Sequence, residues 1–335
     1  MRRVLVPLSV SSGLPPPGSR EHCAAGSTMG TTWSVRYLLQ DSAPDAALAA
    51  LMQAQLDEVV AQMSHWEPGS DLSRFNSAPA GSWHHLPEAF FNVLTYGLEV
   101  AYKTGGAYDP CAGALVNIWG FGARQRFDEA HFQAPEAAQI AAIIGRRDRE
   151  RVALDITACR AFQPGQVQLD LSSIAKGYAV DRVAQLLGAR GIDHYLVEVG
   201  GELRGAGLKP DGQPWWVALE GVPGSGDGDG TVVALHGLSV ATSGDYRRYF
   251  EHHGRRASHT LDPRTGLPIQ NAVASVTVLH RDCMAADALS TALTVLGPQA
   301  GMRFAEQEGL AARLLVRREG TLEERCSTAF NELLQ

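Results

Sequence analysis

The chain has 335 residues, of which 45% are hydrophobic and 19% charged, enough apolar material for one large domain or two modest ones. Its formal charge of −7 argues against a general nucleic-acid-binding protein, because no lysine- and arginine-rich face stands out that would neutralise a phosphate backbone. Five scattered cysteines without a CxxC pair predict neither a disulfide framework nor a zinc cluster.

The N-terminal residues match a secretory signal only in part. Two arginines precede a short apolar patch, Val4–Val10, which Pro7 interrupts, and no convincing cleavage site follows. Cys23 follows Arg-Glu-His, where a lipoprotein signal has small apolar residues. We therefore predict a flexible lead-in over residues 1–27 and one domain over 28–335, with a cytoplasmic location favoured. No segment reaches the roughly 18 apolar residues of a membrane span.

Alternation and helical spacing predict the first elements in chain order. The stretch TTWSVRYLL alternates as a strand, and apolar residues then recur at helical spacing over residues 45–63. A second helix follows Pro87 and ends at the Gly105-Gly106 pair. A third runs from Ala175 to Arg190, closed by Gly191 as a left-handed cap.

The second half of the chain alternates strands and helices irregularly. The glycine-rich residues 221–230 predict a hairpin tip, because strand patterns flank them on both sides. Without regular βαβ alternation the pattern predicts an α+β fold. The predicted strands are 194–199, 215–220, 231–235 and 274–280, and the final helices are 283–296 and 299–309.

Asp287 and Thr291 stand four residues apart on one of these predicted helices. Carboxylate and hydroxyl therefore project from one face, and two oxygen ligands suit a hard cation such as Mg²⁺. The alternative is a solvent-facing aspartate beside a threonine bonded to its own backbone.

Two further stretches carry polar groups next to glycine. In LDLSSIAKGYAVD, Asp170 ends a strand-like run and Lys176 opens a helix, whose N-terminus attracts anions such as phosphate. A capped helix with an exposed lysine explains these residues equally well. Asp109, in a glycine-flanked loop, is placed to accept hydrogen bonds from the N–H groups of a heterocycle.

The stretch SHTLDPRTG is unusually dense in polar groups for a connecting loop. Pro263 and Gly266 restrict its backbone, and Arg264 is expected to pair with a nearby carboxylate. His259 is then a titrating group able to move a proton near neutral pH. A structural histidine is the alternative.

Taken together, eight motifs resemble the ApbE family in identity and order, over roughly Met29 to Gly297. They are MGTTWSVRY, MSHWEPGSDLSRFN, GAYDP with LVNIWGFG, DLSSIAKGYAVDRVA, YLVEVGGELRG, SVATSGDYRRYF, SHTLDPRTG and ADALSTAL. The resemblance implies an α+β fold related to the tunnelling-type architecture. It also implies a Mg²⁺-dependent FAD:protein FMN transferase, which attaches FMN through a phosphoester to a threonine or serine of a target flavoprotein and releases AMP.

The resemblance also implies roles for individual residues. His259 matches a histidine beside the scissile pyrophosphate, where it can accept the proton of the incoming hydroxyl, with Asp262 as a candidate to orient it. The implied metal ligands are Asp287, Thr291 and the backbone carbonyl at Ser173, with Ser290 as a further candidate. The implied FAD contacts are Met29, Asn76, Asp109, Asp170, Lys176, Thr260 and Leu261.

Two alternative functions would also use a flavin but would not transfer FMN to a protein. With water as acceptor, the same site would be an FAD pyrophosphatase giving FMN and AMP. A non-catalytic flavin-binding assembly factor is the alternative from another class, and the presence of His259, Asp287 and Thr291 favours an enzyme over it. The expected partners are a target flavoprotein of the redox or ion-pumping reductase type and no nucleic acid. Family members are often exported, which makes a periplasmic location the alternative to the cytoplasm.

Overall fold

The computed structural model describes residues 3–10, 13–40, 46–124, 126–147, 151–222, 230–245, 249–252 and 255–334. Its chain forms two compact units, each made from separated segments. Unit 1 comprises Met1–Glu58, Lys176–Gly244 and Ala272–Gln335, and unit 2 comprises Val59–Ala175 and Asp245–Asn271. The residues of unit 2 interrupt those of unit 1 twice along the chain, while the single domain over residues 28–335 stays a prediction.

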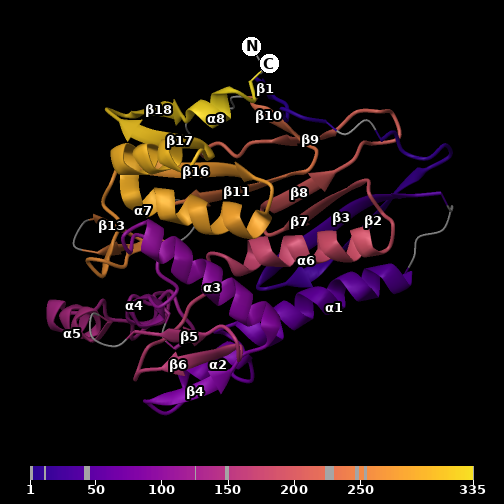
Figure 1. Cartoon of the computed structure of the whole chain (residues 1–335). Helices are drawn as coiled ribbons and strands as arrows, with labels where there is room; N and C mark the ends of the chain where they lie inside the picture. Colours follow the sequence, from indigo (N-terminus) through magenta and orange to yellow (C-terminus); the bar gives the residue numbers. More distant parts are fainter. Residues whose placement is uncertain are drawn as a thin grey trace. The chain divides into compact units, whose positions relative to one another are not determined.

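An eight-stranded antiparallel sheet is the main element of unit 1 (Figure 1). Its order is β18-β17-β16-β11-β8-β7-β3-β2. Seven of the eight residues of β16 are buried, so both faces of this strand are covered. This burial explains its β-branched and apolar sequence, VASVTVLH. The strands are β2 (Arg20–Thr28), β3 (Thr31–Leu39), β7 (Tyr195–Val199), β8 (Glu202–Ala206), β11 (Leu238–Gly244), β16 (Val273–His280), β17 (Ala311–Arg318) and β18 (Thr321–Cys326).

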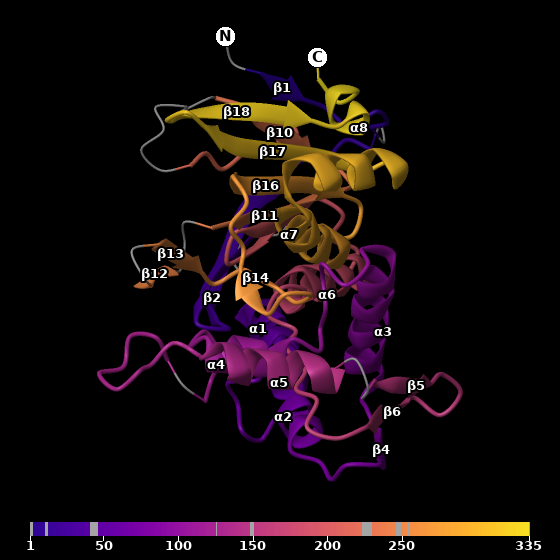
Figure 2. The ribbon, with the colours of Figure 1, turned by 90° about the vertical axis from the view of Figure 1, so that its left-hand side faces the viewer.

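One face of this sheet carries α7 (Cys283–Gln307), which packs against β11 and β16 (Figure 2). The helix is kinked at Gly297, whose φ of 80° and ψ of 180° are not helical, directly before Pro298. The two final helices predicted over 283–296 and 299–309 are therefore confirmed as two helical stretches, which meet at this break and together carry the label α7. The other helices with residues in unit 1 are α1 (Ala46–Met63), α6 (Ala175–Ala189) and α8 (Thr328–Asn331).

The N-terminal segment is part of unit 1. Strand β1 (Val4–Leu5) pairs with β10 (Val232–Leu235), which pairs with β9 (Trp215–Ala218) in a small sheet. The N–H of Val6 donates to the carbonyl of Leu333 at 2.8 Å, and Arg3 forms an ion pair with Glu324. Strand β1 and all of β2 except Thr28 thus lie within the expected lead-in over residues 1–27, β1 paired with the distant β10 and β2 with the adjacent β3.

A core cluster holds the small sheet and the large sheet of unit 1 together. It combines Leu5 and Val233 of the small sheet with Val240 and Leu279 of the large one. Trp215 belongs to the same cluster and is 1% exposed, and its indole N–H donates to the carbonyl of Ala206 at 2.9 Å. Burial of aromatic and aliphatic side chains is the main stabilising contribution here.

Unit 2 is built from short helices and two-stranded or three-stranded sheets. Its core cluster contains Leu115, Trp119, Phe121, Ile140 and Leu261. A three-stranded sheet has the order β4-β6-β5, and two hairpins pair β12 with β13 and β14 with β15. The elements are α2 (Asp71–Asn76), β4 (Ser82–His85), α3 (Glu88–Lys103), α4 (Gly113–Ile118), α5 (Ala137–Arg147), β5 (Ala153–Asp155), β6 (Arg160–Gln163), β12 (Tyr249–His252), β13 (Arg255–Ser258), β14 (Leu261–Asp262) and β15 (Leu267–Pro268).

The α+β fold and most of the predicted elements are confirmed. The strand TTWSVRYLL is β3, the helix over 45–63 is α1, and the helix that ends at Gly105-Gly106 is α3. Gly191, which follows α6, has a φ of 71°, and this confirms the left-handed cap predicted at that position. The antiparallel pair of β9 and β10 confirms the hairpin, while residues 223–229 of its predicted tip lie outside the described residues.

A histidine pair holds the turn after β8. The N–H of Leu208 donates to Nδ1 of His194 at 2.9 Å, and Nδ1 of His236 lies 2.9 Å from the carbonyl of Gly207. Partial burial lowers the pKa of His194, helped by the nearby His236 and opposed by Asp193. Accepting that N–H requires an unprotonated Nδ1.

We expect this turn to make stability depend on pH. The folded pKa of His194 is below its ordinary 6.5, so the unfolded chain binds the proton first as pH falls. The contribution is fully present above about pH 6.5 and is lost as pH drops below that value. Urea unfolding at pH 7.5 and 5.5 should show a smaller difference for His194→Gln than for the wild type. The exposed His85→Gln is the control, and an identical difference in all three proteins would contradict the assignment.

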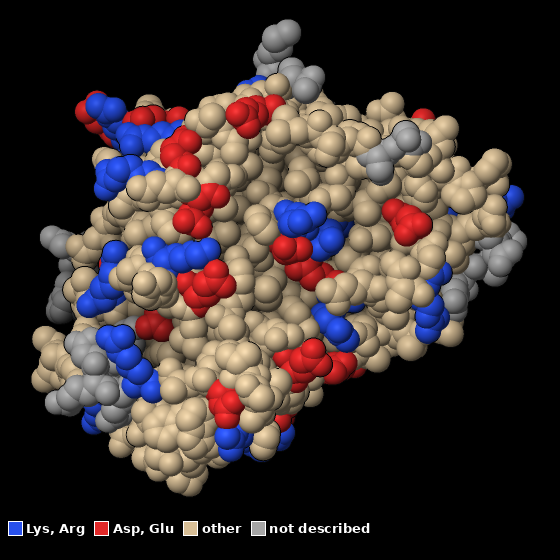
Figure 3. Space-filling view, in the orientation of Figure 1, with Lys and Arg blue, Asp and Glu red and all other residues tan. Residues whose placement is uncertain are grey.

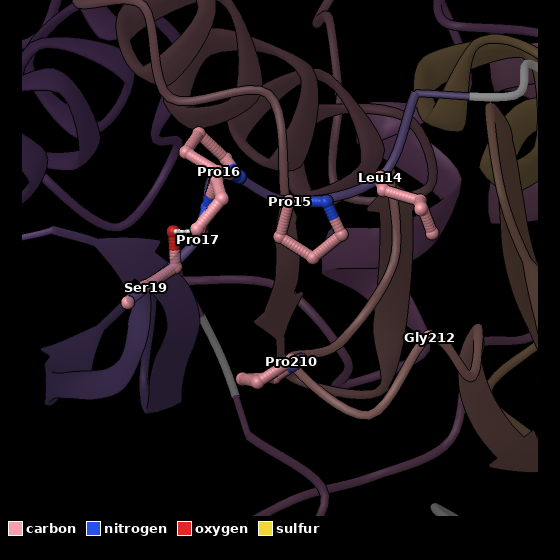
Figure 4. A pocket seen from close by; sticks show the side chains of 8 residues that line it. Leu14, Pro15, Pro16, Pro17, Ser19, Pro210 and Gly212 are labelled. Carbon is pink, nitrogen blue, oxygen red and sulfur yellow. Dashed lines mark hydrogen bonds between the residues drawn. The ribbon is translucent and has the colours of Figure 1, made fainter.

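Charged side chains of both signs are interspersed on the face shown in Figure 3, with lysine and arginine beside aspartate and glutamate. Within the described ranges, no helix combines the length and the apolar character needed to cross a bilayer. A cavity of about 180 Å³ lies in unit 1 between Leu14–Ser19 and the turn at Pro210–Gly212 (Figure 4). None of the predicted site residues lines it.

Candidate functional site

The residues predicted for the site divide between the two units. Met29, Lys176, Asp287 and Thr291 belong to unit 1, and Asn76, Asp109, Asp170, Ser173, His259, Thr260 and Leu261 belong to unit 2.

Asp287 lies on the first turns of α7 and is 5% exposed. Its Oδ2 accepts the N–H of Gly177 at 3.0 Å. Gly177 is the third residue of α6, so this carboxylate satisfies an N–H that has no partner within its own helix. A Cβ at position 177 would lie 2.3 Å from the carbonyl oxygen of Cys283 and 2.8 Å from Cβ of Asp287. Only glycine permits this close approach of α6 to α7.

Thr291 follows one turn later and is half-buried, so carboxylate and hydroxyl share a helix face as predicted. Between them, the hydroxyl of Ser290 donates to the carbonyl of Asp287 at 2.9 Å. That bond uses the proton of Ser290 within the helix. Across the residues that the structure describes, no three His, Cys, Asp or Glu side chains are grouped as metal ligands.

The start of α6 and the strand β8 place a row of charges beside α7. Lys176 forms an ion pair with Glu202, which is 2% exposed. Two residues further along β8, Arg204 forms an ion pair with Asp181 of α6. Alternate residues of a strand face the same side, which explains why both β8 charges reach α6.

Glu202, Arg204 and Asp181 were not predicted as important. The detectable signal was the pattern Glu-Leu-Arg within a strand sequence, since charges two residues apart share one face. Lys176 was predicted at a helix N-terminus and lies there, as the second residue of α6. Its ion pair with Glu202 shows that the lysine is held in a defined position.

Met29 lies at the turn between β2 and β3 with a φ of 51°, followed by Gly30 with a φ of 71°. A positive φ at both positions is the pattern of a two-residue hairpin turn, where asparagine or aspartate commonly precedes glycine. Methionine is unusual at this position, because a positive backbone φ costs conformational energy in any residue that has a side chain.

Three predicted residues of unit 2 lie around residues 168–172. Asn76 donates to the carbonyl of Leu169 at 2.9 Å and accepts the N–H of Leu169 at 2.7 Å. Asp170 is 7% exposed, accepts the N–H of Ser172 at 2.8 Å, and donates its own N–H to the carbonyl of Pro110. Asp109 accepts the N–H of Cys111 at 2.7 Å. The structure thus brings the loop of Asp109 next to Asp170 and anchors both by backbone hydrogen bonds.

A histidine that the sequence analysis did not select also contacts this group. Nδ1 of His65 lies 3.5 Å from Oδ1 of Asp170, and the ring of His65 packs against that of Trp66. Both residues stand in the motif MSHWEPGSDLSRFN, so the motif contained the signal.

His259 follows β13 and is half-buried, with its ring edge-on to Phe121 at a centroid distance of 6.3 Å. The adjacent Thr260 and Leu261 are buried, and the side chain of Leu261 packs in the core cluster of unit 2. His259 therefore stands on a segment that the core holds in place.

The loop after His259 is fixed as the sequence predicted. Arg264 forms a bidentate ion pair with Asp262 at 2.8 Å for both bonds, which confirms the expected pairing of this arginine. Asp262 was the candidate to orient His259, and in the structure its carboxylate pairs with Arg264. Gly266 has a φ of 71°, and a Cβ there would lie 2.6 Å from Ile140. Its carbonyl accepts the indole N–H of Trp119 at 2.8 Å.

Comparisons with known proteins agree with the motif pattern. A family model described as the ApbE family matches residues 29–314. A Vibrio cholerae protein named FAD:protein FMN transferase is 36% identical over 338 residues, covering 100% of this chain and 99% of its own. A Klebsiella pneumoniae protein of that name is 37% identical over 304 residues, covering 90% and 86%.

Solved structures give the same result for the fold. The apo structure of the Pseudomonas stutzeri flavinyl transferase ApbE aligns with a TM-score of 0.84 at 38% identity, covering 94% of this chain and 97% of that one. The flavin transferase ApbE from Vibrio cholerae aligns with a TM-score of 0.84 at 34% identity, covering 94% and 99%.

Proposed function

Because the chain belongs to the ApbE family and is an enzyme of that family, we propose that it transfers FMN from FAD to a hydroxyl of a target protein. The observation that carries the proposal is the match along essentially the whole length of a protein named for this reaction. In the reaction, the hydroxyl oxygen of a threonine or serine attacks the FMN phosphorus. The phosphoester bond forms, the pyrophosphate bond breaks, and AMP leaves.

We propose that His259 accepts the proton of the attacking hydroxyl. An imidazole can do so near neutral pH, and its half-buried position leaves part of the ring accessible to a substrate. The buried residues Thr260 and Leu261 and the bidentate pair in the following loop restrict its motion. A base that is already held in place loses less conformational entropy when it orients toward the substrate. The restricted position of His259 therefore supports a catalytic role.

The donor set on α7 fits a hard cation. Asp287 offers a buried carboxylate, and Thr291 offers a hydroxyl one turn later on the same face. We propose that these two residues hold Mg²⁺, while the carbonyl at Ser173 stays a prediction from the family resemblance. When bound, Mg²⁺ supplies charge neutralisation at the pyrophosphate.

The remaining predicted residues are proposed to bind FAD. The positive φ of Met29 is a backbone cost that a ligand contact would explain. Lys176 offers a positive charge at the N-terminus of α6, where anions are favoured. Asn76, Asp109 and Asp170 are anchored by backbone hydrogen bonds, which would keep a polar surface for the heterocycle in place.

The proposed partner is a flavoprotein subunit of the redox or ion-pumping reductase type with an acceptor threonine or serine. An FAD pyrophosphatase is the main alternative, since water can attack the same phosphorus.

The experiment combines the protein with FAD, Mg²⁺ and a candidate target domain. The expected result is a mass increase of the target by one FMN phosphoester, with one AMP released per modified target. Replacing the acceptor threonine of the target by valine is the control and should remove the mass increase. Release of AMP and free FMN at the same rate without any target would replace this proposal by the pyrophosphatase.

A further inference from the structure

The helices α6 and α7 cap each other. Asp287 of α7 accepts the N–H of Gly177 in the first turn of α6. In return, Asp181 of α6 accepts the N–H groups of Cys283 and Met284, the first two residues of α7, at 3.1 and 2.9 Å. Carboxylates at helix N-termini satisfy orphan N–H groups and interact favourably with the helix dipole.

This cap replaces the local one. Asp282 occupies the N-cap position of α7, but its side chain makes no capping hydrogen bond and is about half exposed. The start of α7 is therefore held by a residue 102 positions before Cys283 in the chain, on a neighbouring helix. A local cap would fix only the helix end, whereas this one also fixes where α7 begins relative to α6.

Asp181 is itself held firmly. It is 6% exposed and forms an ion pair with Arg204 of β8. Its neighbour Cys283 is buried, and Gly177 permits the close contact of the two helices one turn before Asp181. These two contacts restrict rotation and sliding of α7 along α6, because packed interiors deform little.

We propose that Asp181 is a positioning residue for Asp287, which fixes the register of α7 on α6 and thereby the carboxylate assigned to Mg²⁺. The inference rests on the proposed function for the identity of the metal ligand. Asp181 acts through α7 and does not itself touch metal or substrate. Residues that orient metal ligands commonly change metal affinity about 10–100-fold when they are replaced.

The test measures Mn²⁺ binding to the full chain with FAD present, using the EPR signal of free Mn²⁺, and FAD affinity without metal by flavin fluorescence. Asp181→Asn keeps the shape but removes the charge and one of the two acceptor oxygens. We expect Mn²⁺ affinity to fall about tenfold or more with FAD affinity unchanged. The matched control is Asp282→Asn, which removes the same charge from the same helix end without removing a cap, and it should bind Mn²⁺ like the wild type.

A purely structural role predicts a different pattern. It would lower the melting temperature of Asp181→Asn while leaving Mn²⁺ affinity unchanged in the folded protein, and that result would overturn the proposal. If Asp181→Asn does not fold, Gly177→Ala takes its place, because its methyl group separates the same two helices. Unchanged Mn²⁺ affinity in folded Gly177→Ala would equally overturn it.

Asp287→Asn separates this inference from the proposed function. If Asp287→Asn binds Mn²⁺ like the wild type, the metal assignment fails and the positioning role fails with it. If Asp287→Asn loses Mn²⁺ while Asp181→Asn and Asp282→Asn bind it equally, only the positioning role fails.

Discussion

Asp287→Ala is expected to reduce FMN transfer to the background level. The substitution removes the carboxylate assigned to Mg²⁺ and leaves the N–H of Gly177 without its acceptor. A loss of several kcal/mol of transition-state stabilisation corresponds to about 10³-fold or more in rate. The measurement is the initial rate of target modification by intact mass at saturating FAD.

Asp287→Asn separates the two losses, because its amide oxygen can still accept the N–H of Gly177. We expect Asp287→Asn to melt closer to the wild type than Asp287→Ala and to remain equally inactive. Asp282→Asn is the control on the same helix and should keep its rate. Normal transfer by Asp287→Asn at ordinary Mg²⁺ concentrations would show that α7 does not hold the metal.

His259→Ala is expected to lower FMN transfer by about 10²–10⁴-fold, the usual effect of losing a positioned general base. FAD affinity and melting temperature should change little, because the loop after His259 is held by Asp262, Arg264 and Gly266. Raising Mg²⁺ should not rescue the rate. The exposed His131→Ala in the same unit is the control.

The pH dependence adds an independent readout for His259. Only a neutral imidazole can accept the hydroxyl proton, so wild-type transfer should rise between about pH 5 and 8, where histidine side chains lose their proton. His259→Ala should lose this rise. A joint fall in FAD affinity and melting temperature would identify a structural histidine instead, and full transfer by a normally folded variant would exclude both roles.

Elements with a strong local signal were predictable. The helix α1 shows apolar residues at helical spacing, and α3 ends at a glycine pair that interrupts any helix. The strand β3 combines alternation with β-branched and aromatic residues. In these segments the local preference and the tertiary structure agree, so the sequence alone was sufficient.

Elements that depend on a pairing partner rather than on their own composition were not predictable. The sequence REHCAAGST of β2 has small and polar residues on both faces, and it is a strand because β3 pairs with it along its full length. Val4–Leu5 is a strand because it pairs with β10, more than two hundred residues later. Such pairings are set by the whole fold and leave little trace in local composition.

The candidate site shows the same limit. The one-turn spacing of Asp287 and Thr291 was visible in the sequence, since it follows from helix geometry. The capping of α7 by Asp181 was not visible, because no sequence pattern links residue 181 with residues 283 and 284. The strand charges Glu202 and Arg204 had a weak signal, and only the structure shows that they pair with Lys176 and Asp181.

The segmented construction of unit 1 has a consequence for biosynthesis. Ribosomes deliver the chain from its N-terminus, and its last segment, Ala272–Gln335, contains β16, β17, β18 and α7. Until that segment emerges, β11 lacks a neighbour on one side and Gly177 lacks Asp287. A nascent chain that has reached β11 but not yet β16 therefore carries an open sheet edge, and one that ends before residue 287 lacks the carboxylate proposed to bind Mg²⁺.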